Sequence, residues 1–215
     1  MAGRLIVGAG MMGREHIRVS QLLGWADVQG IVDPDGGSLE WACTDWRLLT
    51  DAPLTIYRDL SEACLDEAVD AIVIATPNHT HRDVLHAVSA SHKPVLLEKP
   101  MATTLADAMD IVSLARDYPA VIQLGMQYRF KAQYVDALQA VAAESTLGQV
   151  KTVAMSEYRP PFLDKVDQWN KFNRNSGGTL VEKCCHYFDL INVVAQSQPR
   201  QVYASGGRAV NFLDF

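Results

Sequence analysis

A glycine-rich turn near the amino terminus constrains the fold of this chain more than any other feature. Residues 4–7 form an apolar run that predicts a strand, and Gly-Ala-Gly-Met-Met-Gly follows it directly at 8–13, before a helical pattern. In such a turn Gly8 permits the tight bend, Gly10 lets the backbone approach a pyrophosphate, and Gly13 lets the helix pack against the strand. The motif predicts a dinucleotide-binding domain whose phosphate-binding residues are Gly8, Gly10, Met11, Met12 and Gly13.

An acidic residue stands at the distance that such a domain requires. Asp33 follows the apolar run 28–32 and lies about 20 residues after Gly13. A carboxylate there can accept hydrogen bonds from both ribose hydroxyls of an adenosine. The same charge repels a 2′-phosphate, and no arginine follows within 34–38. We therefore expect NAD rather than NADP. In the structural alternative, the glycines only make a tight turn and Asp33 caps a local segment.

The first 125 residues alternate short apolar runs with helical patterns. Several runs lack polar alternation, as strands covered on both faces should. Strands that alternate with helices predict right-handed crossovers and a parallel sheet. We therefore predict an α/β Rossmann domain, a doubly wound parallel sheet, over 1–125. Its expected strands are 4–7, 28–32, 71–75, 95–97 and 120–124, and its clearest helical segments are 14–23, 80–90 and 104–117.

A different pattern begins at residue 126. Helices are expected over 131–144 and 180–195, and strands over 149–158 and 201–205. A two-stranded sheet is marginal by itself and leaves open edges that invite pairing. The segment 126–215 therefore predicts an incomplete α+β domain for substrate binding or oligomerisation, whose sheet could join two copies of the chain into a homo-oligomer.

Composition excludes several classes of function. The net charge of −6 argues against a dedicated nucleic-acid binder, because a phosphate backbone needs a basic surface. The first apolar run is too short for a membrane span and lacks the cleavage region of a signal peptide. The histidine and cysteine spacings match no zinc motif, so we expect no metal. Free thiols in a reducing cytoplasm are the simplest interpretation of Cys43, Cys64, Cys184 and Cys185.

Two further motifs end the third and fourth strands of the core. Ala-Thr-Pro-Asn-His-Thr-His occupies 75–81, and Glu-Lys-Pro occupies 98–100. Ligands of open α/β sheets bind outside the carboxyl ends of the strands, so both motifs are expected at the cofactor crevice. Pro100 restricts Lys99 to an extended backbone, which could hold the lysine in the cleft. A Glu-Lys-Pro turn is, taken alone, also typical of a solvated loop.

A third group of polar residues lies in the later helical pattern. Glu182, His186 and Asp189 are spaced at i, i+4 and i+7, which places them on one face of a continuous helix. A carboxylate one turn from an imidazole can fix its tautomer and stabilise its charged form. The pattern indicates a general base with an orienting partner. The alternative is an exposed helix face with salt bridges.

Taken in order, these motifs resemble the Gfo/Idh/MocA family, the glucose–fructose oxidoreductase and inositol dehydrogenase group. The resemblance rests on the glycine turn, on 75–81, on Glu-Lys-Pro at 98–100, and on Gly-Gly at 177–178 followed by the Glu182 to Asp189 pattern. It covers residues 1 to about 205. It implies a Rossmann domain followed by an α+β domain with a large open sheet, and hydride transfer between a pyridine nucleotide and a sugar, cyclitol or related polyol. Family members are considerably longer, so the second domain looks truncated.

The resemblance also implies roles for individual residues. Lys99 matches the family's lysine that contacts both the nicotinamide and the reacting hydroxyl group. His186 matches the family's proton-transferring histidine. Glu182 stands where many members have aspartate, and Cys184 where they commonly have glycine, so either the orientation of His186 or the substrate pocket could differ. The remaining residues that the resemblance places along the dinucleotide are Thr76, Pro77, Asn78, His81 and Glu98.

The expected chemistry follows from these roles. His186 takes the hydroxyl proton, Lys99 stabilises developing negative charge on the substrate oxygen, and Glu182 holds the imidazole in its productive tautomer. Aromatic and polar side chains near the crevice, Tyr128 among them, could hold a sugar, although each such residue is more often a core or surface residue. The alternative function is a non-catalytic dinucleotide-binding protein or an inactive remnant. The residues expected to bind substrate are Lys99, Arg129, Tyr158, Trp169 and His186.

Overall fold

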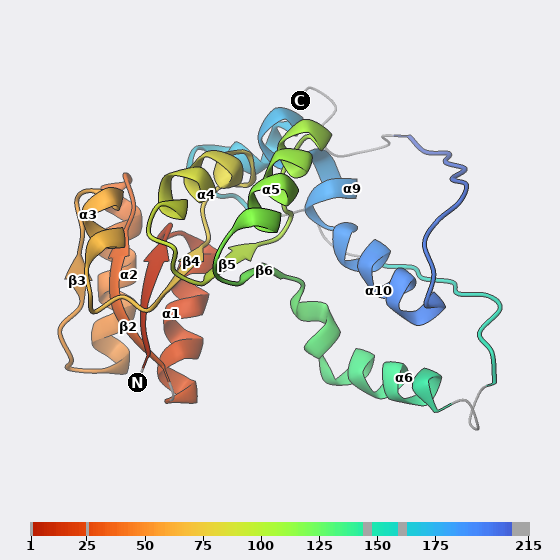
Figure 1. Cartoon of the computed structure of the whole chain (residues 1–215), viewed down its shortest axis with the longest axis horizontal. Helices are drawn as coiled ribbons and strands as arrows, with labels where there is room; N and C mark the ends of the chain where they lie inside the picture. The colour runs from red at the N-terminus through yellow and green to blue at the C-terminus, as the bar shows by residue number, and fades with distance from the viewer. Residues whose placement is uncertain (1, 25, 144–147, 159–162, 208–215) are drawn as a thin grey trace.

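The computed structural model describes residues 2–24, 26–143, 148–158 and 163–207. Its framework is one sheet of parallel strands in the order β3-β2-β1-β4-β5-β6 (Figure 1). The chain fills one side of β1 before it crosses to β4 on the other side, and this reversal of strand order is where open α/β sheets bind ligands. The strands are β1 (Ala2–Val7), β2 (Ala26–Val32), β3 (Thr55–Ile56), β4 (Ala71–Ile74), β5 (Val95–Glu98) and β6 (Ile122–Gly125).

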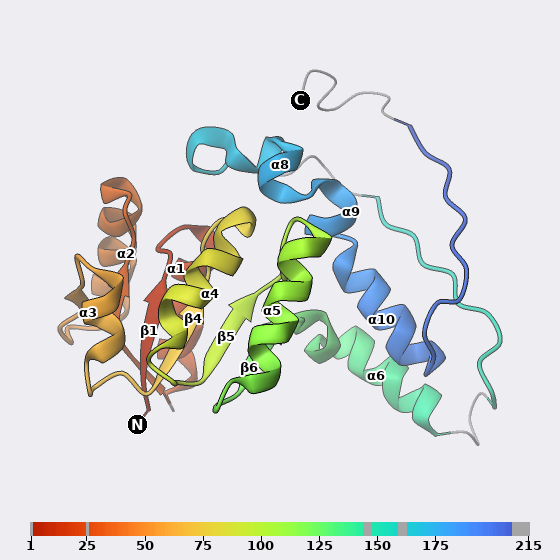
Figure 2. The same ribbon diagram turned by 45° about the horizontal axis from the view of Figure 1, so that its top comes forward.

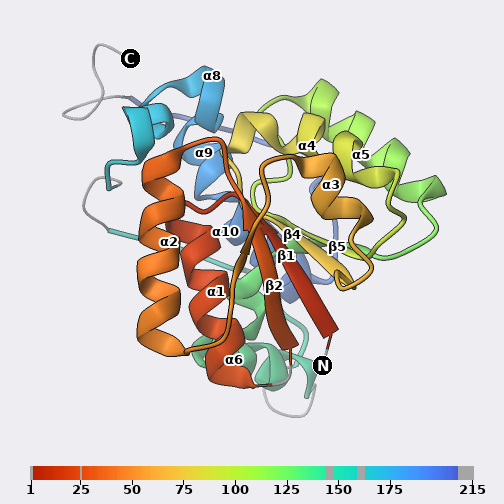
Figure 3. The ribbon, with the colours of Figure 1, turned by 90° about the vertical axis from the view of Figure 1, so that its left-hand side faces the viewer.

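Helices cover both faces of this sheet. Side chains alternate between the faces of a strand, so Ile6 packs with Ile17 and Ala42 of one helical layer, whereas Leu5 packs with Leu85 of the other. Figure 3 shows the two layers on either side of the strands. One layer is α1 (Met11–Leu23) with α2 (Gly36–Leu49), and the other is α3 (Leu60–Leu65), α4 (His81–Ser89) and α5 (Leu105–Asp117).

In the described part of the chain after β6, all regular secondary structure is helical. Helices α6 and α10 lie side by side (Figures 1 and 2). The short helix α8 contacts η1 (Asn78–Thr80), and Figure 2 shows α8 and α9 above the ends to which the strand arrows point. The segments are η2 (Gln127–Phe130), α6 (Ala132–Ala142), η3 (Val166–Lys171), α8 (Asn173–Ser176), α9 (Gly178–Glu182) and α10 (Cys185–Ala195).

The prediction of a doubly wound parallel sheet is confirmed. Each of the five apolar runs expected to be a strand forms one, within a few residues of the expected bounds. The sequence missed β3, because two exposed residues at a sheet edge show no apolar run. Among the described residues, no helix is long and apolar enough to cross a membrane.

The two strands expected after residue 126 are absent. Neither 149–158 nor 201–205 has strand structure. Tyr158, Val202 and Tyr203 are 102%, 80% and 93% exposed, so these segments have no buried face to stabilise a sheet. A segment forms a strand only where a partner supplies the other half of the hydrogen-bond ladder. Within the described ranges there is consequently no second sheet through which two copies could associate.

Candidate active site

The glycine turn leaves an open approach to its backbone. Gly8 has φ +96°, and a Cβ there would meet the Ala75 carbonyl oxygen at 2.7 Å; a Cβ on Gly13 would stand 1.8 Å from the Gly8 carbonyl oxygen. A Cβ on Gly10 would meet nothing within 4 Å. Gly10 is the N-cap of α1 and has no side chain to accept the first amides of the helix. These amides can therefore bind an anion, as a dinucleotide pyrophosphate requires.

Asp33 connects this turn to the end of β2. The Ala9 amide donates to its Oδ2 at 2.6 Å, and the Asp35 amide donates to its Oδ1 at 2.8 Å. The carboxylate therefore holds the turn in place. An ionised carboxylate has about four acceptor positions, so these two bonds leave room for ribose hydroxyls.

The motif at 75–81 serves mainly to join neighbouring loops. Asn78 is buried, and its Nδ2 donates to the Ser176 carbonyl oxygen at 3.1 Å, which links the Rossmann half to α8. His81 is 1% exposed, with Nδ1 2.8 Å from the Pro100 carbonyl oxygen and Nε2 3.0 Å from that of Thr76. Burial lowers the pKa of His81. His81 thus connects the loops after β4 and β5, and Pro77 caps η1 between them.

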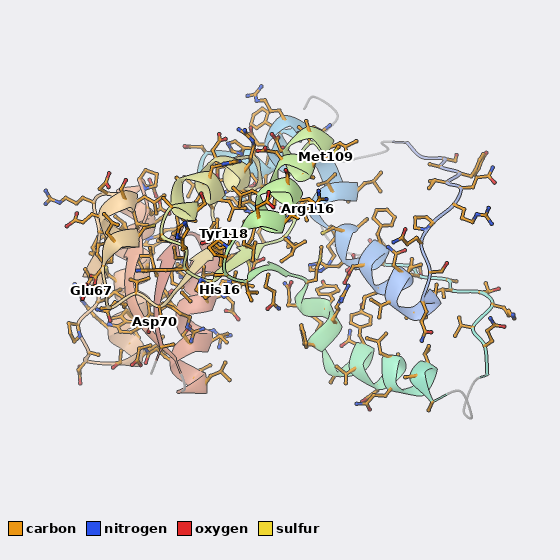
Figure 4. The ribbon with its side chains drawn as sticks, in the orientation of Figure 1. His16, Glu67, Asp70, Met109, Arg116 and Tyr118 are labelled. Carbon is orange, nitrogen blue, oxygen red and sulfur yellow. The ribbon has the colours of Figure 1, made fainter. Side chains whose placement is uncertain are left out.

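Glu98 and Lys99 stand at the carboxyl end of β5. The Glu98 carboxylate is buried, and its Oε1 lies 2.8 Å from Nε2 of His16 on α1, a residue labelled in Figure 4. Burial acts to raise the pKa of Glu98, but the hydrogen bond from His16 and the charges of His16 and Lys99 outweigh it and lower the pKa. Lys99 precedes a cis peptide bond to Pro100, and its Nζ donates to the Glu182 carbonyl oxygen at 3.2 Å.

The expected continuous helix over 180–195 is wrong. Helix α9 ends at Glu182, and α10 begins at Cys185. The amides of Lys183 and Cys184 both donate to the Thr179 carbonyl oxygen, at 3.0 and 3.1 Å. Because two successive amides share one acceptor, the regular i→i−4 ladder stops here.

The break separates Glu182 from His186 and Asp189, which the spacing placed on one helix face with it. The Glu182 carboxylate accepts a hydrogen bond from Lys165 Nζ at 3.1 Å. Asp189 accepts one from Arg129 Nε at 2.7 Å. His186 is 2% exposed, and its Nδ1 is buried without a hydrogen-bond partner among the described residues.

His186 instead lies against an aromatic side chain. The ring of Tyr128 stacks on its imidazole, and Nζ of Lys183 donates to the Tyr128 hydroxyl. Burial, followed by the positive charges of Lys99 and Lys183, lowers the pKa of His186 to about 4. The imidazole is therefore neutral at physiological pH and has a free lone pair, as a proton acceptor needs.

The other expected substrate residues have different surroundings. Arg129 pairs with Asp189, Tyr158 is fully exposed, and the Trp169 ring lies 4.2 Å from Nζ of Lys165. Among the residues with defined positions, no three His, Cys, Asp or Glu side chains gather as a metal site would require. Sequence reasoning missed the roles of His16, Lys165 and Lys183; only Lys183, next to Glu182, lay within a motif that the sequence had marked.

The fold and the site together define a class: a dinucleotide-binding Rossmann protein with a lysine and a buried neutral histidine beside the carboxyl edge of its sheet. Comparison with known proteins agrees. The model described as "Oxidoreductase family, NAD-binding Rossmann fold" of the Gfo/Idh/MocA family matches residues 3–126. The model of the family's C-terminal alpha/beta domain matches residues 142–212. The chain belongs to the Gfo/Idh/MocA family of NAD-binding oxidoreductases.

Individual relatives fit this assignment. An inositol 2-dehydrogenase of Leifsonia xyli subsp. xyli is 35% identical over 194 residues, which cover 88% of this chain and 52% of that protein. The structure of a putative myo-inositol dehydrogenase from Sinorhizobium meliloti 1021 has a TM-score of 0.76 at 21% identity. The match covers 93% of this chain and 56% of the dehydrogenase chain. The structure of GenD2 from gentamicin A biosynthesis in complex with NAD has a TM-score of 0.73 at 25% identity. The match covers 90% of this chain and 53% of the GenD2 chain. The chain spans about half the length of the curated relatives that it matches.

Proposed function

We propose that this protein is an oxidoreductase that transfers a hydride between NAD and the hydroxyl-bearing carbon of a sugar, cyclitol or related polyol. The observation that carries the proposal is the approach of two groups from distant parts of the chain. Lys99 Nζ bonds to the Glu182 carbonyl oxygen, and its charge acts on the imidazole of His186. The inositol dehydrogenases among the relatives support a polyol substrate.

The cofactor would lie along the carboxyl edge of the sheet. The open side of Gly10 and the uncapped start of α1 suit its pyrophosphate. Asp33 would accept the ribose hydroxyls and repel a 2′-phosphate, which favours NAD over NADP. The remaining proposed cofactor residues are Gly8, Met11, Met12, Gly13, Thr76, Pro77, Asn78, Glu98 and Lys99. The buried His81 would support this site by holding together the loops after β4 and β5.

The residues of this chain divide the proton and charge chemistry between them. A bound nicotinamide supplies the hydride acceptor or donor. His186, neutral above about pH 4, accepts the hydroxyl proton at Nε2. The ammonium of Lys99 donates to the substrate oxygen and stabilises the charge that develops there. Glu182 acts through its carbonyl oxygen, which holds Lys99, and through its carboxylate, which holds Lys165.

The polyol would lie between the two halves of the chain. Lys99 and His186 would contact its reacting carbon and oxygen. Trp169 offers an indole ring beside the Lys165 ammonium, and such a ring suits the apolar face of a sugar. Tyr158 is exposed and Arg129 carries several donors, so we propose both as further contacts with hydroxyl groups.

Substitution of His186 tests the function directly. A positioned base contributes about 10²–10⁴-fold to rate, so His186→Ala should lose turnover on that scale in a screen of sugars and inositols. Its affinity for NAD should stay at the wild-type value, because the imidazole is assigned to the substrate. His86→Ala is the matched control, since His86 lies on the outer helix α4 beside Asp110.

Three results would each overturn a part of the proposal. If wild-type protein is stabilised by NAD in a thermal shift but turns over no polyol, the chain is a dinucleotide-binding protein without this activity. If turnover occurs and His186→Ala leaves it unchanged, the proton acceptor is another group. Tighter binding of NADPH than of NADH would refute the preference assigned to Asp33.

A further inference from the structure

The imidazole of His186 lies flat against the ring of Tyr128. The ring centroids are 3.9 Å apart, and the planes differ by 4°. Tyr128 belongs to η2, directly after the Rossmann sheet, whereas His186 belongs to α10. The contact therefore joins the two halves of the chain at the residue to which we assign proton transfer.

Stacking matters here because no hydrogen bond from the described residues orients this imidazole. A histidine that transfers protons is usually oriented by a bond from its second ring nitrogen to a carboxylate or a carbonyl group. The Nδ1 of His186 is buried and has no such partner among the described residues. The carboxylate expected to fill this role, that of Glu182, is bound to Lys165.

Tyr128 is itself held in place on several sides. Lys183 Nζ donates to its hydroxyl and lies 3.4 Å from a carboxylate oxygen of Glu157. Lys131 Nζ stands 3.7 Å from the ring centroid, and the Tyr134 ring stacks at 5.6 Å. A ring with this many contacts has little freedom to rotate, so it can serve as a fixed support.

We propose that Tyr128 is a positioning residue: its ring holds the His186 imidazole in the orientation that accepts the substrate proton and keeps water away from it. The proton-transfer part of this inference rests on the proposed oxidoreductase function. The stacking part does not, and it is testable without turnover.

The charges around the imidazole give the inference a measurable consequence. Lys99 and Glu98 face it from the end of β5, Lys131 from the start of α6, and Lys183 from the break before α10. Burial is the largest cause of the lowered pKa of His186. If the ring of Tyr128 keeps water out, its removal should raise the pKa of His186 toward the ordinary value of about 6.5.

Proton NMR of the wild-type protein gives the first test. An aromatic ring stacked face to face shifts the imidazole carbon-bound protons of its neighbour upfield. The His186 signals are assigned by their loss in His186→Gln. We expect them upfield of the signals of the exposed His86; signals at the positions of an unstacked histidine would overturn the inference, and this outcome depends on no variant of Tyr128.

Two substitutions separate the ring from the hydroxyl. Tyr128→Phe keeps the stack and should leave the titration midpoint of His186 near that of wild type. Tyr128→Leu removes the ring and should raise the midpoint by about one pH unit or more. Where turnover is detected, Tyr128→Leu should lower kcat about tenfold or more with a smaller change in KM, because misplacing a catalytic group costs rate. Tyr203→Leu, at a 93% exposed tyrosine, is the control.

The outcomes distinguish this inference from the proposed function. A raised midpoint in Tyr128→Leu alone supports positioning by the ring, whether or not any polyol is turned over. Equal midpoints in Tyr128→Leu and wild type overturn it, even if the protein proves to be an active dehydrogenase. A raised midpoint in Tyr203→Leu as well would also overturn it, because the change would then not be specific to the stack.

Discussion

The two halves of the described chain are stabilised in different ways. Among the residues with defined positions, every buried apolar side chain except Leu190 lies between Leu5 and Ile111. Buried polar side chains are spread more evenly, and the later half holds Asn170, Ser176, Glu182, Lys183 and His186. The Rossmann half is thus built around an apolar core, whereas the later half surrounds polar groups with little apolar burial.

This difference shows how the site depends on the fold. Burying a polar group costs free energy unless it finds a hydrogen-bond partner. In the later half some of the partners come from the Rossmann half, as in the contacts of Asn78 with Ser176 and of Lys99 with Glu182. We infer that the first half carries the stability and that the second half supplies chemistry placed by contacts with the first.

The largest expected effect is on the core of the Rossmann half. Leu5 is 0% exposed in β1, so Leu5→Ala should lower the free energy of unfolding by about 2–5 kcal/mol. Val202→Ala, at an 80% exposed position of the later half, should stay within about 0.5 kcal/mol. Urea unfolding measures both. Equal losses of unfolding free energy in the two variants would contradict the difference between the two halves, because they would show an apolar core that extends through the later half.

The glycine turn allows a sharper division between stability and binding. A Cβ on Gly13 would stand 1.8 Å from the backbone oxygen of Gly8, so Gly13→Ala should cost about 1–3 kcal/mol of stability. Gly10→Ala meets no atom within 4 Å and should unfold like wild type, yet bind NAD about tenfold more weakly. Thermal unfolding and NAD titration check the pair. Unchanged NAD affinity in Gly10→Ala would place the pyrophosphate elsewhere.

The pH dependence of stability probes the later half. The pKa of His186 is about 4 in the folded protein and about 6.5 when unfolded. Between these values the unfolded chain binds the extra proton, so the free energy of unfolding falls as the pH is lowered from about 6.5 to about 4. We expect a smaller fall in melting temperature over this window for His186→Gln than for wild type. Parallel curves would show that the imidazole is not desolvated.

The smallest expected effect concerns a pair within the later half. Arg129 Nε lies 2.7 Å from Asp189 Oδ2, and the Arg129 side chain is 46% exposed. Exposed ion pairs contribute about 0.2–1 kcal/mol, so Arg129→Gln should destabilise the protein by that amount and less at high salt. Denaturant unfolding at two salt concentrations measures it. A larger, salt-independent loss would mean that this half depends on the pair more than its exposure indicates.

Much of the first half could be predicted from the sequence, and less of the second. Apolar runs and the glycine turn located all its strands except β3, and the position of Glu98 and Lys99 after a strand placed them at the sheet edge. The i, i+4 spacing of Glu182 and His186 failed as a structural guide, because it assumes a continuous helix and the chain breaks at Lys183 and Cys184. No local pattern marked Lys165 as the partner of Glu182.

What the sequence determined by itself is the βα framework and the strand ends where its polar residues stand. Periodicity and turn geometry arise between residues close together in the chain, so the amino-acid order is enough to show them. Tertiary structure alone decided that Tyr128 covers His186, that Lys165 takes the carboxylate of Glu182, and that Asn78 reaches α8. These contacts join segments whose separation along the chain carries no periodic signal, and packing of the whole molecule selects them.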